Sequence, residues 1–236
     1  MTIQTPTQVA TGTSERDRLI GRVAWYAAWF GLVLGQLHAL ARHRTEDGRG
    51  DLDLPLTRFW AEPAGDLFSP LLTWAGPDVV YSTYGKLWLP VFVAFTLCAF
   101  VVRRRRQPVG FEKWAWRIAL TGYVGATVSV VAEYWTQWGS MNQDFLDAVF
   151  LATVPFLLIT MIGSTLLGAA LLRRRMRPSA PAWLLALCIP GLVAISMVTS
   201  LGNVVLPIAF AFGLLGRRIG RETAQPSEVV AAPVTA

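Results

Sequence analysis

Long apolar runs that end at clusters of arginine constrain the fold of this sequence more than any other feature. The run at 145–172 is closed by Arg173, Arg174, Arg175 and Arg177. About 20 predominantly apolar residues suffice for a helix to cross the roughly 30 Å hydrocarbon core of a bilayer. Composition agrees, because only 15% of the 236 residues are charged, whereas a water-soluble domain carries about a quarter. The sequence therefore predicts an all-α, polytopic integral membrane protein built as a helical bundle.

Six spans account best for these runs. The last two come from one uncharged stretch, Trp183–Gly216, which is too long for one ordinary crossing and contains Pro190 and Pro207. Dividing it leaves a short sixth segment that must tilt little, thin the bilayer locally or lie partly re-entrant. The predicted transmembrane domain covers 19–216, with spans at about 19–41, 87–102, 114–138, 145–172, 183–199 and 204–215.

The distribution of basic residues predicts the orientation. Cytoplasmic segments of membrane proteins carry an excess of Lys and Arg, and with six spans and an inside N-terminus the inner segments hold 16 of the 21 basic residues. A five-span arrangement would place Arg217, Arg218 and Arg221 outside. We therefore expect both termini in the cytoplasm. The arginine-rich, alanine-rich composition is typical of a GC-rich bacterium, so the expected location is a bacterial plasma membrane.

Three segments lie outside the predicted spans. The ends, 1–18 and 217–236, are polar or low in complexity and are expected to be disordered. The outer loop, 42–86, begins with a solvated stretch to residue 53 and continues with aromatic residues and turn formers that predict short interfacial helices. A cleaved signal peptide is the alternative for 19–41, because Ala39-Leu40-Ala41 has a small-x-small form.

Small residues mark predicted helix-packing faces. Gly31 and Gly35 form a GxxxG pair on the first span, and Gly122 and Gly125 lie on the third. Such faces let helices approach closely in a bilayer. A discarded signal peptide would have no use for the first pair, which favours a retained helix. The same faces could engage a protein partner or a second copy of the chain.

His38 and Glu133 are the ionisable residues whose placement inside the predicted spans costs the most free energy. An ionisable side chain inside the bilayer costs about 2.5 kcal/mol or more on insertion scales. Glu133 lies a few residues from the outer end of the third span, and His38 lies at a similar depth on the first. The two could shuttle a proton, act as acid and base or bind a cation, because burial and a charged neighbour shift both pKa values. The alternative is a structural pair that only fixes helix packing.

Further polar residues cluster at predicted outer ends. Asp144 and Asp147 also suit a helix N-cap with an acidic first turn, and Asn203 suits a tight turn. Together with His38 and Glu133 we expect these residues to line an outward-facing polar vestibule: Gln36, Gln137, Asn142, Asp144, Asp147, Thr199, Ser200 and Asn203.

Signals for cofactor, metal and nucleotide chemistry are weak. The sequence contains no GxSxG, P-loop, GxGxxG or HExxH pattern. Cys98 and Cys188 lie within apolar runs and are interpreted as core residues, and Asp51-Leu52-Asp53 is a three-residue match of the kind that arises by chance. We therefore expect no cofactor and no metal site. We also expect no nucleic-acid partner, because the basic residues flank membrane spans instead of forming a polar face.

Three functional hypotheses remain. A non-enzymatic membrane module or accessory subunit, in contact with lipids and a partner, is favoured by the lack of a catalytic signature. A small proton-coupled transporter would use Glu133 and His38. A lipid- or quinone-active enzyme would use His38 as base, with Glu133 or Asp144 as the orienting acid.

Overall fold

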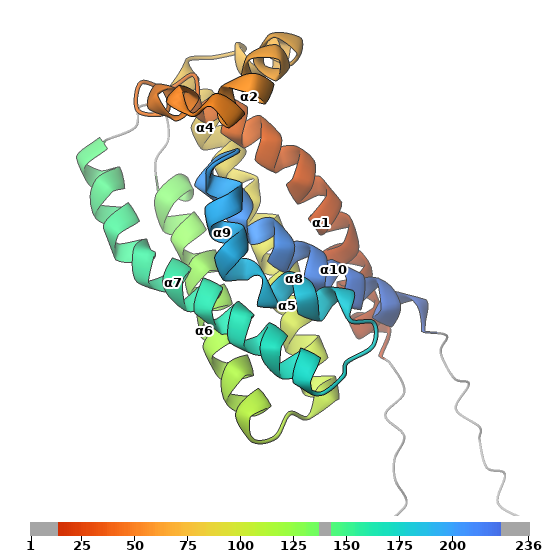
Figure 1. The fold of residues 1–236 in the computed structure, drawn as a ribbon. Coiled ribbons are helices and arrows are strands. Elements are labelled where there is room, and N and C mark those ends of the chain that lie inside the picture. The colour runs from red at the N-terminus through yellow and green to blue at the C-terminus, as the bar shows by residue number, and fades with distance from the viewer. Residues whose placement is uncertain (1–13, 137–142, 223–236) are drawn as a thin grey trace, which may run out of the picture.

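The computed structural model describes residues 14–136 and 143–222, and every regular element in these ranges is a helix (Figure 1). The predicted all-α class is therefore confirmed, and the protein is membrane-embedded by the length and apolar composition of its helices. Within these two ranges, five helical segments are long and apolar enough to cross a membrane: Glu15–Arg42, Pro77–Arg106, Phe111–Trp135, Asp147–Arg173 and Leu201–Arg221.

The first span, α1 (Glu15–Arg42), begins four residues before the predicted start at Leu19. The Ser14 side chain accepts a hydrogen bond from the Asp17 backbone N–H, and acidic residues occupy the first turn. Both features stabilise a helix N-terminus. The predicted disordered segment to residue 18 is wrong at this end, because Ser14 caps a polar first turn that hydropathy alone does not reveal.

The second span is longer than the predicted 87–102. It consists of α4 (Pro77–Lys86) and α5 (Trp88–Arg106), which together form one candidate crossing. The predicted outer loop therefore ends at α4. At the opposite end, Gln107 adopts a left-handed conformation with φ of 47° and ends α5.

Prolines follow breaks in two of the helical segments. A proline lacks the N–H that would bond to the carbonyl four residues earlier, and its ring clashes with that carbonyl. Pro90 follows the break between α4 and α5, and the freed Lys86 carbonyl instead accepts a hydrogen bond of 3.2 Å from Trp135 Nε1. Pro190 stands in the same position after the break between α8 (Ala180–Ala186) and α9 (Cys188–Ser196).

The last two predicted spans differ in length from the helices that the structure contains. The segment predicted as 183–199 falls on the short helices α8 and α9, neither of which is long enough to cross by itself. The segment predicted as 204–215 is instead part of a long crossing, made of the 3₁₀ helix η3 (Leu201–Val205) and α10 (Leu206–Arg221). The prediction of a short sixth segment is thus wrong.

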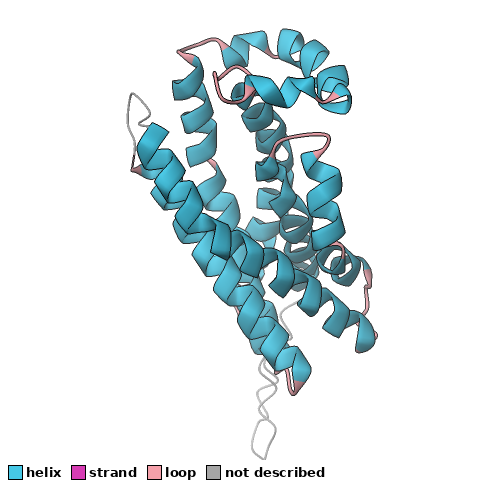
Figure 2. Ribbon diagram, turned by 60° about the vertical axis from the view of Figure 1, so that its left-hand side comes forward, coloured by secondary structure: helices cyan, strands magenta, loops and turns pink. Residues whose placement is uncertain are grey.

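Two groups of helices form the bundle. In one, α1 packs along α10, α5 and α4; in the other, α6 (Phe111–Val130) packs along α7 (Gln143–Arg173), and α8 lies between α7 and α10. Figures 1 and 2 show α6 and α7 running side by side. A Cβ atom added to Gly21 would lie 2.4 Å from the Gly216 carbonyl oxygen, so α1 and α10 approach as closely as their backbones allow.

The start of α1 and the end of α10 lie at the arginine-rich end of the bundle (Figure 1). Asp17, which is buried, bonds to Arg104 at 2.6 Å, and Arg105 pairs with Glu222. Arg106 pairs with Glu112 at the beginning of α6. At this end of the bundle, ion pairs therefore tie α5 to α1, α6 and the end of α10.

The outer loop forms the opposite end. It contains the 3₁₀ helix η1 (Arg49–Asp53), α2 (Pro55–Leu67) and α3 (Ser69–Leu72). The helical part of the predicted loop is thus present, and η1 lies where an irregular solvated stretch was expected. Arg42 bonds to Asp51 at 2.8 Å and holds η1 against the end of α1.

Candidate functional site

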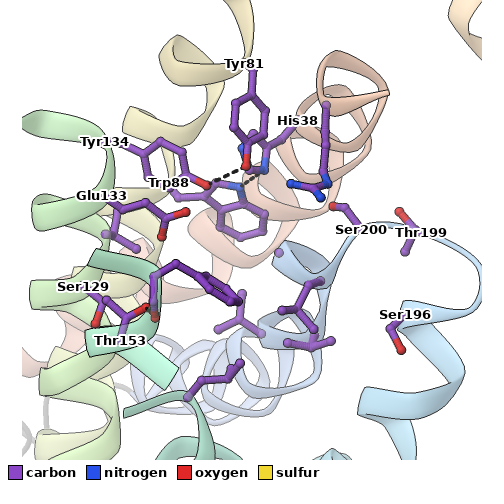
Figure 3. A pocket seen from close by; sticks show the side chains of 18 of the residues that line it. His38, Tyr81, Trp88, Ser129, Glu133, Tyr134, Thr153, Ser196, Thr199 and Ser200 are labelled. Atoms are coloured by element: carbon purple, nitrogen blue, oxygen red, sulfur yellow. Dashed lines mark hydrogen bonds between the residues drawn. The ribbon is translucent and has the colours of Figure 1, made fainter. Parts of the chain in front are cut away.

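A cavity of about 600 Å³ occupies the outer half of the bundle. One wall comes from α6, the following π-helical turn η2 (Val131–Trp135) and α7, and the other from α1, α9 and η3. Figure 3 shows Ser129, Glu133 and Thr153 on one side and Ser196, Thr199 and Ser200 on the other. Residues of the outer loop, including Asp51, Leu54 and Thr57, line its outer end.

An aromatic cluster around His38 forms one wall of the cavity. The His38 ring stacks on Tyr81, with ring centroids 4.6 Å apart and an interplanar angle of 6°. The Tyr81 and Tyr134 hydroxyls are 3.2 Å apart, and Tyr134 meets His38 edge-on at 5.6 Å. Gly85 makes room for this arrangement, because a Cβ atom there would lie 2.1 Å from the Tyr134 ring.

The hydrogen bonds of His38 define its tautomer. Trp88 Nε1 donates to His38 Nδ1 at 3.3 Å in a buried environment. A neutral imidazole whose Nδ1 accepts carries its proton on Nε2. His38 is 4% exposed, and Nε2 has no hydrogen-bond partner among the described residues. His38, a residue of the cavity lining, therefore carries a buried donor with no partner in the described part of the chain.

Glu133 reaches the same cavity from a distorted helix. It lies in η2, where the backbone bonds follow the wider π-helical pattern that often occurs at functional sites. Glu133, Arg42 and the aromatic residues Tyr81 and Tyr134 all line this one cavity. Glu133 forms no salt bridge among the described residues.

Two residues of the cavity lining also carry a buried hydroxyl group without a partner in the described part of the chain. They are Thr160, which is 2% exposed, and Ser200, which is 6% exposed. Buried polar atoms almost always have a hydrogen-bond partner in folded proteins. The inner part of the cavity is apolar by contrast, and its lining includes Phe92, Leu157, Met161, Val204 and Val205.

The structure brings some of the predicted vestibule residues together and not others. His38, Glu133, Asp147, Thr199 and Ser200 line the cavity. Three others do not, because Gln36 and Asp144 face elsewhere and Asn203 is used for packing. The remaining two, Gln137 and Asn142, lie outside the described residues.

Asn203 and Asp144 differ from their predicted local roles. Asn203 lies inside η3, is 1% exposed and donates to the Gly35 carbonyl at 3.3 Å and to Thr199 Oγ1 at 2.8 Å. It therefore links η3 to α1. Helix α7 begins at Gln143, so Asp144 lies in the first turn, where it faces the helix dipole favourably, and not at the N-cap.

The four predicted packing glycines all lie at close helix contacts. Cβ atoms built on them would meet Val91 at Gly31, Asn203 at Gly35, Thr160 at Gly122 and Phe156 at Gly125, at distances between 1.9 and 3.1 Å. The first two contacts join α1 to α5 and η3, and the last two join α6 to α7. Because these contacts are internal, none of the four glycines offers a free face to a second chain.

Sequence reasoning missed most of the aromatic cluster. Tyr81 and Trp88 are seven residues apart and face α1 together, although a break separates their helices. Tyr134 directly follows Glu133 and could have been included with it. Arg42 lies four residues after His38, one helical turn further along α1, a spacing that places both on one face.

Metal and thiol chemistry receive no support from the described residues. They contain no group of three or more His, Cys, Asp and Glu side chains that could hold a metal ion. Cys98 and Cys188 are buried and donate to backbone carbonyls of Phe212 and Leu184. Both therefore fill the interior, as their surroundings in the sequence predict.

His43, just beyond the end of α1, lies outside the cavity. Burial lowers the pKa of His43 from its usual 6.5; the Asp51 carboxylate opposes this shift, and the Arg42 charge adds to it. Both ring nitrogens lack a partner in the described residues, and the ring meets Trp60 at 6.1 Å. His43 is therefore held neutral beneath the outer loop.

Comparison of the chain with protein-family models, curated proteins and solved structures finds no match.

Proposed function

We propose that this chain is a non-enzymatic membrane module whose outward-facing vestibule binds a small molecule. The observation that carries the proposal is one cavity of about 600 Å³ whose lining residues include three with an unpartnered polar atom, His38, Thr160 and Ser200. A cavity of this size is within the range of small-molecule sites, which combine apolar walls with a few placed polar groups. A bound molecule would supply the missing hydrogen bonds.

The proposed topology has six crossings with both termini on the cytoplasmic side of a bacterial plasma membrane. Supporting it, α5, α7 and α10 all end in arginine-rich stretches at one end of the bundle, and the helices of the loop 42–86, whose residues line the vestibule, lie at the other end (Figure 1). In this topology α8 and α9 together make a short crossing with a proline break. Lipid surrounds the bundle, and a protein partner would have to use faces other than those of the internal glycines.

Filling the vestibule tests the proposal. Ser129 lines the cavity, whereas the adjacent Val128 is 60% exposed on the outside of α6. We expect Ser129→Trp to displace a small molecule that copurifies with the full-length chain, detected by mass spectrometry of the gently solubilised protein. Val128→Trp, which adds the same side chain on the lipid side, is expected to retain it. Identical molecules in both variants, or none in the parent chain, would contradict the proposal.

Proton-coupled transport is the second candidate. It is favoured by Glu133 on a π-helical turn and by the discontinuous segment of α9 and η3, since transporters often build their sites from broken helices. In proteoliposomes a transporter would move the copurifying molecule against a proton gradient, and Glu133→Gln would stop that movement. A binding module would move none.

A further inference from the structure

We propose that the vestibule selects an organic cation, a ligand with a positively charged centre on an apolar body. This inference rests on the proposed function, because it names the class of ligand that the same cavity takes. It is carried by the charges of the lining, by its aromatic faces and by the unpartnered polar atoms.

The charged lining of the cavity is strongly acidic. Among the described residues that line it, a single guanidinium, that of Arg42, stands against five carboxylates, and it is already bonded to Asp51 at 2.8 Å. A cleft of one sign of charge with low-dielectric walls concentrates ions of the opposite sign. An anionic ligand would meet repulsion along its entry path. The five carboxylates are those of Asp47, Asp51, Asp78, Glu133 and Asp147.

Glu133 lies deeper than the other carboxylates and is the natural counter-ion. It neighbours Tyr134, and Figure 3 shows it directed toward the space between α6 and the aromatic cluster. The other acidic side chains with no bonded arginine lie near the outer ends of their helices or in the outer loop. They would attract a cation to the entrance, and Glu133 would neutralise it inside.

Aromatic faces complete the environment of a cation. The lining includes Tyr81, Trp88, Phe92, Tyr134 and Phe150. A cation within about 6 Å of an aromatic face is attracted by the ring quadrupole, and the attraction is larger where water is excluded. One face of Tyr81 is covered by His38. These rings would also hold the apolar body of the ligand.

The unpartnered atoms indicate that the ligand carries polar groups as well. The hydroxyl oxygens of Thr160 and Ser200 can accept a hydrogen bond from an ammonium N–H. His38 Nε2–H can donate to a hydroxyl or carbonyl oxygen elsewhere on the same molecule. Hydroxyl groups also donate, so these three positions do not by themselves exclude an anion. An anionic headgroup is disfavoured because it would oppose Glu133 and the other carboxylates of the lining.

Three probes of related shape and different charge separate these possibilities. Tetraphenylphosphonium is a cation, tetraphenylborate an anion and triphenylphosphine oxide a neutral hydrogen-bond acceptor. Binding to the full-length chain in detergent is measured by equilibrium dialysis, after subtraction of uptake by empty micelles. We expect the phosphonium to bind at least about tenfold more tightly than the neutral probe, and the borate to bind most weakly.

Carboxylate-to-amide variants test the proposed counter-ion. Glu133→Gln is expected to weaken phosphonium binding at least about tenfold and to leave the neutral probe unchanged. Asp147→Asn, at an exposed position on α7, should weaken phosphonium binding by a smaller factor without affecting folding. Asp66→Asn is the matched control, because Asp66 is exposed on α2 outside the cavity.

The outcomes distinguish the two proposals. If the neutral and cationic probes bind equally tightly, and Glu133→Gln and Asp147→Asn change neither affinity, the cation inference is overturned. The proposal that the vestibule binds a small molecule would still stand. Preferential binding of the borate would do the same. If the phosphonium affinity survives in Ser129→Trp, or if no probe binds the parent chain, both proposals fail.

Discussion

His38 differs from most buried histidines because one nitrogen is bonded and the other is not. Trp88 holds the ring in place through Nδ1, and stacking on Tyr81 fixes its plane. The unbonded Nε2 is buried, on a residue that lines the cavity. A residue kept only for helix packing would gain by bonding both nitrogens, since a buried unsatisfied donor costs about 1–3 kcal/mol.

The bond between Trp88 and His38 can be measured by a double-mutant cycle. Trp88→Phe and His38→Phe each remove one partner and preserve a ring for packing. We expect a coupling free energy of about 1 kcal/mol between them, because each single change leaves the other group buried and unsatisfied. The measurement is the free energy of unfolding in detergent for the parent, both single variants and the double variant. Strictly additive losses would show that the two side chains do not interact.

His43 predicts a pH dependence of stability. Its pKa is lowered by burial in the folded chain, so the unfolded chain takes up the proton first as the pH falls below 6.5. By linkage the folded state loses stability from about pH 7.5 toward about pH 5. The His43→Phe variant lacks this titration, so its stability relative to the parent should rise over that range. A constant difference between the two chains across the range would contradict this account.

Helix boundaries show what the sequence could and could not predict. Hydropathy and arginine clusters located the apolar core of each span, because those features depend on local composition. The breaks before Pro90 and Pro190 are equally local, and the matching positions of the two prolines could have been used. The packing of η3 against α1 could not be predicted in this way, since it involves a hydrogen bond from Asn203 to Gly35, 168 residues away in sequence.

Close contact between α1 and α10 makes Gly21 a sensitive position. Any side chain there would collide with the Gly216 carbonyl, a backbone atom that cannot move aside. We expect Gly21→Ala to destabilise the protein by about 1–3 kcal/mol, as overpacking of a well-filled interior does. The measurement is the free energy of unfolding in detergent.

Gly191→Ala is the matched control, because it lies within α9 with open space around its added methyl group. Its expected effect is neutral or stabilising by up to about 1 kcal/mol, from helix propensity. If both alanine variants behaved alike, the proposed backbone contact between α1 and α10 would not exist.

The candidate site was only partly predictable because its residues come from most of the helices of the bundle. An ionisable side chain near the end of a membrane span costs free energy, and this criterion selected His38 and Glu133 as candidate site residues. Both line the cavity. Gln36 satisfied the same criterion and does not line it, since polarity alone does not give the direction of a side chain. Tyr81 and Tyr134 cost little free energy in a bilayer, so this criterion does not select them. Their role in the site follows only from the packing of α4 against η2 in the structure.

The six-crossing topology predicts labelling from opposite sides of the membrane. Gly65 in α2 has open space around it, and Val109 before α6 is 63% exposed, so cysteine can be introduced at either position. We expect a membrane-impermeant maleimide to label Gly65→Cys on intact cells and Val109→Cys only after permeabilisation. The parent chain is the blank, because Cys98 and Cys188 are buried. Labelling of both variants on intact cells would contradict the proposed arrangement.

The pairing of the first and last described helices also determines when the vestibule can be completed during synthesis. A helix that leaves the ribosome early inserts into the bilayer long before the final crossing is made. His38 meets Gly202, and Gly35 meets Asn203, only after η3 and α10 have arrived. Until then α1 carries an unfilled glycine groove and an isolated histidine in lipid. The face of α1 that contacts η3 and α10 in the folded protein thus remains unpaired for most of translation. A factor that covers this face of α1 during that interval would increase the yield of folded protein.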